Sequence, residues 1–251
     1  MMPPRPAALA AISHGTSSPA GQAVVQALAD EVQRLAASEH EAGRPVGTVK
    51  LGHVDVQQPD VAATLDALPE GEPAVLVPLL LSAGFHVNVD MKEAVDAAGR
   101  PAVIAGALGP DERLAAVLQR RLEEAGAELG QDTVILAAAG SSDTSAVRDV
   151  GETARLLSER LGTPVQDAYL SFAQRSVPAA VRAAQEQNPS GRVAVVSYLL
   201  APGYFQDLLE SRATEAGAAV ITQPLLHLHE DTPRVPAELP RIVLDRYGLA
   251  S

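Results

Sequence analysis

Three side chains that suit metal chemistry follow three short apolar runs in the first half of this 251-residue sequence. His14 and Asp55 come directly after the first two runs, and His86 comes shortly after the third. Imidazole and carboxylate groups bind divalent first-row metals and also act as bases near neutral pH. If the runs are parallel strands, their carboxyl ends meet at the sheet edge where ligands bind. The spacing therefore predicts a site for a metal ion or for proton transfer.

The pattern around these side chains predicts an α/β fold. Four apolar runs of strand length alternate with amphipathic stretches of helical spacing. The expected strands are 7–13, 48–54, 73–81 and 101–108, and the expected helices are 23–38, 61–68, 89–98 and 111–126. This alternation is typical of a parallel sheet with helices packed on its faces.

The second half of the sequence repeats the first. Strands are expected at 133–139, 164–172, 192–200 and 218–226, with a last helix around 240–248. The turn HGTSS at 14–18 matches AGSSD at 139–143, and VPLLLSAGFHVN at 77–88 matches VSYLLAPGYFQD at 196–207. An internal duplication therefore predicts two similar lobes, 1–126 and 131–251, each a parallel sheet flanked by helices, with a ligand cleft between them.

Composition excludes several classes of protein. The net charge is −12 and no run of Lys and Arg occurs, which argues against nucleic acid and an anionic membrane as partners. The absence of Cys excludes disulfides, thiolate zinc sites and iron–sulfur clusters. The apolar stretch near the N-terminus is broken by prolines and suits neither a signal peptide nor a membrane span, so we expect a cytoplasmic protein. We expect it to be a monomer or a homodimer.

The turn GTSSP at 15–19 has two compatible interpretations. Gly15 makes the turn, Ser17 or Ser18 caps the next helix, and Pro19 suits its first turn. The same helix N-terminus can hold a carboxylate or phosphate. We therefore expect Gly15, Thr16 and Ser17 to contact an anionic ligand. The matching turn, GSSD at 140–143, adds Ser141 to this set.

Other histidines offer weaker candidates. The segment HLHED at 227–231 would place His227 and His229 on one face only if it is extended, and we expect it to be a surface loop of the second lobe. His53 would share the face of Asp55 if the second strand continued. His40 is expected to lie in a polar loop and to carry no role.

The motifs together resemble those of the sirohydrochlorin chelatases, the CbiX/SirB group of class II tetrapyrrole chelatases. The similarity rests on ISHGTSS, GHVDVQQP, GALGPDERLAAVL and, most specifically, VPLLLSAGFHVNVDM, and it extends over nearly the whole chain. The resemblance implies that His14 and His86 bind the metal. It also implies that Asp55 stands at the position of an acidic residue that is commonly Glu in that group.

The resemblance implies one catalytic centre, in the first lobe. In the second lobe Ala139 replaces His14, Ser171 replaces Asp55 and Phe205 replaces His86, so that lobe is expected to hold substrate, with Phe205 as an apolar contact. The implied reaction is insertion of Fe2+ into sirohydrochlorin for siroheme, with the divalent ion as substrate. No tightly bound cofactor is expected, and no P-loop motif occurs.

Three alternatives stay open at this stage. The first is insertion of Co2+, for cobalamin, or of Ni2+ instead of Fe2+. The second is a non-catalytic carrier of a tetrapyrrole or a metal. The third is an anion-binding α/β module in which the two GSS-type turns bind the ligand and the histidines are incidental.

Overall fold

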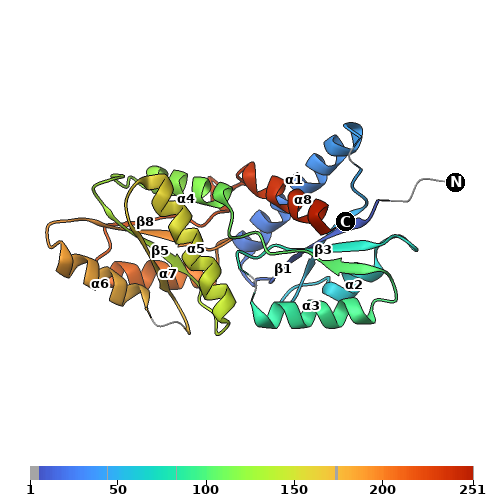
Figure 1. The fold of residues 1–251 in the computed structure, drawn as a ribbon, viewed down its shortest axis with the longest axis horizontal. Helices are drawn as coiled ribbons and strands as arrows, with labels where there is room; N and C mark the ends of the chain where they lie inside the picture. Colours follow the sequence, from blue (N-terminus) through green and yellow to red (C-terminus); the bar gives the residue numbers. More distant parts are fainter. Residues whose placement is uncertain (1–5, 44, 83, 173–174, 251) are drawn as a thin grey trace. The chain divides into compact units, whose positions relative to one another are not determined.

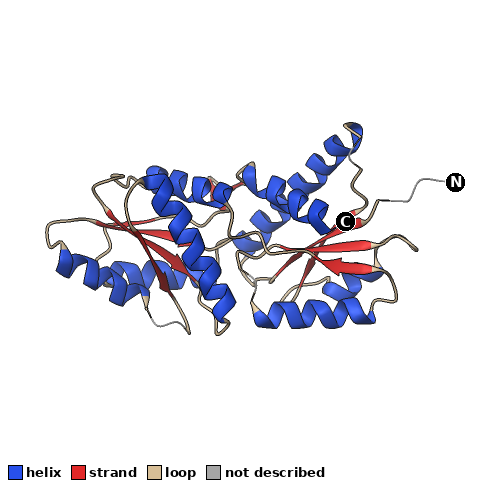
Figure 2. Ribbon diagram, in the orientation of Figure 1, coloured by secondary structure: helices blue, strands red, loops and turns tan. Residues whose placement is uncertain are grey.

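The chain forms two α/β units (Figures 1 and 2). A computed structural model describes residues 6–43, 45–82, 84–172 and 175–250. Unit 1 comprises the chain up to Leu108 together with the segment from Ala237 onward, and unit 2 comprises Gly109–Pro236. Each unit is built around a four-stranded parallel sheet flanked by helices, which confirms the predicted fold class.

Unit 1 has the strand order β2-β1-β3-β4. Its strands are β1 (Ala8–Ser13), β2 (Val49–His53), β3 (Ala74–Pro78) and β4 (Ala102–Ile104). Its helices are α1 (Pro19–Glu41), α2 (Val61–Asp66), α3 (Phe85–Ala97) and α8 (Glu238–Ala250). Helices α1 and α8 lie on one face of the sheet, and α2 and α3 lie on the other (Figure 1).

Unit 2 repeats this arrangement with the order β6-β5-β7-β8. Its parallel strands are β5 (Thr133–Ala138), β6 (Val165–Tyr169), β7 (Val193–Tyr198) and β8 (Val220–Ile221). Its helices are α4 (Glu112–Glu124), α5 (Thr144–Leu161), α6 (Val177–Gln187) and α7 (Tyr204–Glu215). Two sheets of the same order are what a duplicated unit produces, because each half repeats the same connections.

The two units do not end where the predicted lobes end. We predicted lobes of residues 1–126 and 131–251, but α4 belongs to unit 2 and α8 belongs to unit 1. Arg121 of α4 donates to the carbonyls of Pro224 and Leu225. In unit 1, the C-terminal helix is fixed by Arg246, which donates to the carbonyls of Ala107 and Leu108. The chain therefore exchanges the fourth helix of each half, which a linear repeat pattern cannot reveal.

The segment that contains HLHED also differs from the prediction. It forms an antiparallel hairpin of β9 (His227–His229) and β10 (Thr232–Arg234), not a loop. Glu230 and Asp231 make its tight turn with positive φ angles of 48° and 59°. The pattern was too short to distinguish a three-residue strand from a loop.

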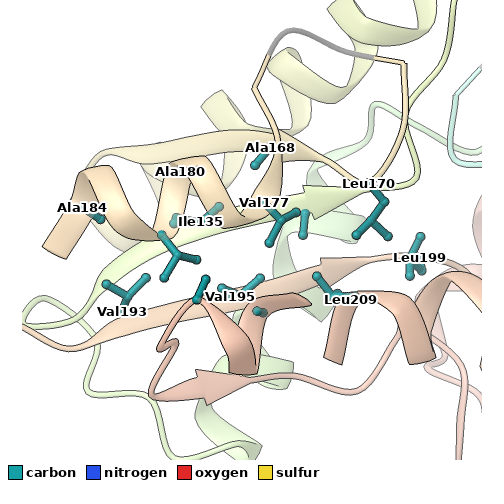
Figure 3. Close-up of a cluster of buried hydrophobic side chains, with 14 residues drawn as sticks. Ile135, Ala168, Leu170, Val177, Ala180, Ala184, Val193, Val195, Leu199 and Leu209 are labelled. Carbon is teal, nitrogen blue, oxygen red and sulfur yellow. The ribbon is translucent and has the colours of Figure 1, made fainter. Parts of the chain in front are cut away.

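Separate apolar clusters hold the two sheets. Strands β1 and β7 are buried along their whole lengths, as expected for central strands covered on both faces. In unit 2, one cluster joins β5, β6 and β7 to α6 and α7, with Ile135, Val195 and Leu209 among its members (Figure 3). In unit 1, a second cluster includes Ile12 of β1 and Leu76 of β3, and it fixes the strands whose following loops carry the candidate site. In the described part of the chain, no helix is long and apolar enough to cross a membrane.

Candidate active site

The β1–β2 pairing continues beyond the last strand residues and brings His14 beside Asp55. Val54 N–H donates to the Ser13 carbonyl at 2.9 Å, and Asp55 N–H donates to the His14 carbonyl at 2.9 Å. Both side chains are exposed. The predicted placement of these two residues at one sheet edge is therefore what the structure contains.

Gly15 allows the two loops to touch. It has φ of 92°, and a Cβ atom at this position would lie 1.9 Å from the Asp55 carbonyl oxygen. No side chain fits there. On the other loop, Val56 has φ of 65° and is 61% exposed, an unusual conformation for a β-branched residue. The Asp55 carboxylate accepts the Val56 N–H at 2.7 Å, so it is folded back onto its own loop.

The predicted anion contacts of this turn are partly occupied by the protein itself. Gly15 N–H donates to the Ser13 hydroxyl at 3.2 Å, and Thr16 N–H donates to the Gln57 side-chain oxygen at 2.9 Å. Ser18 is the N-cap of α1 and accepts from Gly21, which confirms one of the two capping residues considered. The Ser17 hydroxyl is exposed and has no partner among the described residues. Of the predicted set, Ser17 is the best placed to meet a ligand.

A buried hydrogen bond between two polar side chains lies next to the loop that carries His14. Ser13 Oγ and His53 Nδ1 are 2.7 Å apart, and both residues are only 4% exposed. Burial lowers the pKa of His53, which favours a neutral ring. His53 ends β2 inside the protein and does not share the exposed face of Asp55. The sequence pattern missed this role because a histidine at a strand end is more often exposed.

His86 is the second residue of α3, after the N-cap Gly84. Because β1, β2 and β3 run parallel, the chain leaves β3 and enters α3 at the same sheet edge that carries His14 and Asp55. The His86 side chain lies outside the described residues. Among those that are described, no group of three potential metal ligands is found. The joint site of the three residues therefore stays a prediction.

The corresponding edge of unit 2 has the same backbone contacts but different side chains. Ser171 N–H donates to the Ala139 carbonyl at 2.9 Å, as Asp55 does to His14. A Cβ atom on Gly140 would lie 1.9 Å from the Ser171 carbonyl oxygen, as on Gly15. Phe205 is the second residue of α7, as His86 is of α3. These contacts confirm the predicted correspondence of the two halves.

The remaining candidates lie in unit 2. The Ser141 hydroxyl accepts the Asp143 N–H at 3.0 Å, just as Thr16 accepts from Ser18 in unit 1. His227 and His229 do share one face of β9, because the segment is extended. The pKa of His227 is lowered by burial and by the nearby charge of Arg121. A neighbouring cation disfavours a bound metal ion, so the HLHED pair has little support as a metal site.

Several solved structures share this two-unit fold and define it as that of the chelatases. SirB from Bacillus subtilis with Fe3+ is 19% identical, with a TM-score of 0.77 over 96% of this chain and 94% of that one. A structure of CbiX, described as the terminal enzyme of siroheme biosynthesis in denitrifying bacteria, is 18% identical, with a TM-score of 0.68 over 98% and 99%.

The chain belongs to the CbiX family, whose sequence profile matches residues 8–125 and 133–227. A sirohydrochlorin cobaltochelatase of Sulfurisphaera tokodaii is 33% identical over 79 residues. That match covers 30% of this chain and 66% of the relative, so it spans slightly less than two thirds of the relative's length. The family suspected from the motifs is thus confirmed.

Proposed function

We propose that this protein inserts a divalent metal ion, Fe2+ first among the candidates, into sirohydrochlorin. The observation that carries the proposal is the continued β1–β2 pairing, which sets His14 and Asp55 on touching loops at the sheet edge from which the chain enters α3. Membership of the CbiX family supports it, since the relatives that match include a sirohydrochlorin cobaltochelatase. Unit 1 would carry the metal site and unit 2 would hold the tetrapyrrole.

His14 and His86 would receive the ion and replace part of its water shell. Two imidazoles bind a first-row ion less tightly than a closed site of four ligands, so the ion can be passed on to the ring. His14 is exposed, so an ion bound to it would keep open coordination positions. A ring nitrogen of the substrate can take one of them.

Asp55 would assist proton removal. The free ring holds two N–H protons, and both must leave as the ion enters between the nitrogens. A carboxylate or a neutral imidazole can accept them. Asp is one methylene shorter than Glu, and the Asp55 carboxylate is already bonded to Val56 N–H. It would therefore act on the ion or on the protons through a bridging water molecule.

The turns after β1 and β5 would meet the carboxylates of the substrate. Ser17 offers an exposed hydroxyl, while Gly15 and Thr16 fix the turn through bonds to Ser13 and Gln57. In unit 2, Ser141 stands at the position that Thr16 has in unit 1, and Phe205 would contact the ring. The proposed compartment is the cytoplasm.

The test is to follow the absorbance of sirohydrochlorin under anaerobic conditions with Fe2+, Co2+ or Ni2+. No nucleotide or other cofactor is added. The purified protein is expected to accelerate metal insertion well above the spontaneous rate, with many turnovers per protein molecule. Binding of sirohydrochlorin or of the metal without any acceleration of metal insertion would instead identify a carrier. If the protein binds neither the metal nor the tetrapyrrole, the anion-binding module is the alternative that remains.

Cobalt insertion is the second candidate. The relative from Sulfurisphaera tokodaii is named a cobaltochelatase, and the match to it spans 79 residues. The ligand set does not decide between the ions, because imidazole and carboxylate accept both. Comparison of kcat/KM for Fe2+ and Co2+ on the same preparation decides it.

A further inference from the structure

The few aromatic residues of this protein are distributed unevenly. The chain has three Phe and four Tyr and no Trp. Tyr169, Tyr198 and Tyr247 are buried, and each hydroxyl has a hydrogen-bond partner. By contrast, Phe172, Tyr204 and Phe205 are 83%, 73% and 39% exposed, and all three follow the carboxyl ends of unit 2 strands. Exposed aromatic side chains gathered at one edge mark a binding surface.

The backbone holds Phe172 outward in a costly conformation. Its φ is 58°, in the left-handed region that residues other than Gly rarely adopt. The preceding residue, Ser171, is fixed by two bonds to the Ala139 carbonyl, from its N–H at 2.9 Å and its hydroxyl at 2.7 Å. Strain that the surroundings maintain at an exposed position is characteristic of functional sites.

A hydrogen bond between α7 and the end of β6 shows which side of α7 faces the loop after β6. Arg212 of α7 donates to the Leu170 carbonyl at 2.8 Å, two residues before Phe172. Phe205 lies seven residues before Arg212 and therefore on the same helix face. Leu209 lies between them on that face and packs in the cluster that includes Leu170 (Figure 3). Phe205 is thus on the side of α7 that faces the Phe172 loop.

The dimensions of this surface suit a large flat ligand. The Tyr204 and Phe205 rings meet edge to face, with centroids 5.4 Å apart and planes at 72°. The strands that precede the two aromatic positions, β6 and β7, lie on either side of β5. Two strand spacings separate their ends by about 10 Å. A tetrapyrrole ring is broad enough to contact both positions at once.

Two arginines add positive charge at the same edge. Arg148 lies in the second turn of α5, and Arg175 immediately precedes Ser176, the N-cap of α6. Both are exposed, and neither guanidinium forms a hydrogen bond or salt bridge with a described residue. Their charges act on Asp143 and Tyr169, respectively. In a chain of net charge −12, two such arginines favour a ligand that carries carboxylates.

We propose that Phe172, Tyr204 and Phe205 form a shelf for one face of the tetrapyrrole, and that Arg148 and Arg175 bind its peripheral carboxylates. This proposal rests on the proposed function, because it takes sirohydrochlorin as the ligand. Aromatic rings contact the apolar face of such a macrocycle, and guanidinium groups pair with its carboxylates in bidentate geometry. Unit 2 would thus have exchanged metal chemistry for recognition of the organic substrate.

The test compares substrate and metal kinetics in variants of the full chain. Phe172→Ala is expected to raise KM for sirohydrochlorin about tenfold, and the Phe172→Ala/Tyr204→Ala double variant further, while KM for Co2+ stays unchanged. Arg175→Gln and Arg148→Gln should raise the same KM several-fold and reduce its dependence on salt, which a purely structural role would not do.

Two control variants match the exposure and charge of the tested residues. Leu249→Ala removes an equally exposed apolar side chain, 81% exposed on α8 of unit 1. Arg160→Gln removes a cation from the last turn of α5, at the opposite edge of the sheet from Arg148. Both controls should leave the two KM values unchanged.

The outcomes separate this proposal from the proposed function. If the wild-type protein metallates sirohydrochlorin but the Phe172 and Tyr204 variants keep its KM, the shelf is wrong and the function stands. Binding of sirohydrochlorin without metal is measured in parallel by its own fluorescence. If turnover is absent but the aromatic variants weaken that binding about tenfold, the catalytic proposal fails and the shelf is supported.

Discussion

The carboxyl edges of the two sheets share a backbone and differ in almost every side chain that could do chemistry. Both edges use a glycine whose Cβ would lie 1.9 Å from a carbonyl of the neighbouring loop. Both place an exposed apolar residue with positive φ at the loop tip, Val56 in unit 1 and Phe172 in unit 2. Unit 1 then presents His14 and Asp55, where unit 2 presents Ala139 and Ser171.

The two units also differ in the side chains at the ends of the strands that precede these loops. Ser13 and His53 are paired residues of β1 and β2 and form a buried hydrogen bond. Their counterparts in the strand register of unit 2 are Ala138 and Tyr169. Both halves therefore keep the same backbone geometry, which fixes the loops, while the side chains at these positions differ. A turn can be retained for its shape when its side chains change.

The largest effect is expected when unit 1 is given the side chains of unit 2. His14→Ala copies Ala139, and His86→Phe copies Phe205. Either change should reduce metal insertion to near the spontaneous rate, because the ion would lose one of its two proposed imidazole ligands. The measurement is sirohydrochlorin metallation alongside circular dichroism. His40→Ala is the control, and near-normal turnover by a folded His14→Ala or His86→Phe variant would remove that histidine from the mechanism.

The next effect concerns the carboxylate. Asp55→Asn keeps the side-chain shape and removes the negative charge. Ser171, at the matching position of unit 2, is uncharged as well. We expect a loss of roughly 10²–10⁴-fold in kcat, as for removal of a general base. Asp55→Glu should retain more activity than Asp55→Asn. An unchanged rate with unchanged metal dependence in Asp55→Asn would reject its role.

The shared glycines should affect stability by similar amounts in both units. Gly15→Ala and Gly140→Ala each combine a left-handed backbone with a clash against a carbonyl oxygen, and each should cost at least about 2 kcal/mol. Gly43→Ala separates the two causes, since Gly43 has φ of 82° but nothing within 4 Å of its Cβ position. Urea unfolding measures the free energy of unfolding of all three variants. Equal losses for Gly15→Ala and Gly43→Ala would show that the loop contact contributes nothing.

The smallest expected effect is a pH dependence of stability caused by His53 of unit 1. Burial lowers the folded-state pKa of His53 below its ordinary value near 6.5, so the unfolded chain binds its proton more readily. The free energy of unfolding should therefore fall as the pH drops below about 6.5, by at most about 1.4 kcal/mol per pH unit for this group. His53→Gln should flatten that slope. His227 shifts in the same direction, so a second variant, His227→Gln, accounts for its share.

The sequence alone was sufficient for the local features of this protein. Alternation of apolar runs and amphipathic stretches predicted both sheets and their helices, because burial of strands on two faces imposes that pattern. The match of HGTSS with AGSSD predicted the duplication and the correspondence of His14 with Ala139. Residues at strand ends could be assigned to one edge because all strands of a parallel sheet point the same way.

Tertiary structure decided the features that depend on contacts between distant segments. The exchange of α4 and α8 rests on Arg121 and Arg246 bonding to carbonyls of distant loops, and the hairpin at His227 rests on pairing with Thr232–Arg234. The burial of His53 likewise required the position of Ser13. Pattern and spacing report which face of an element is apolar, but they do not report which distant element will cover it, because many partners satisfy the same pattern.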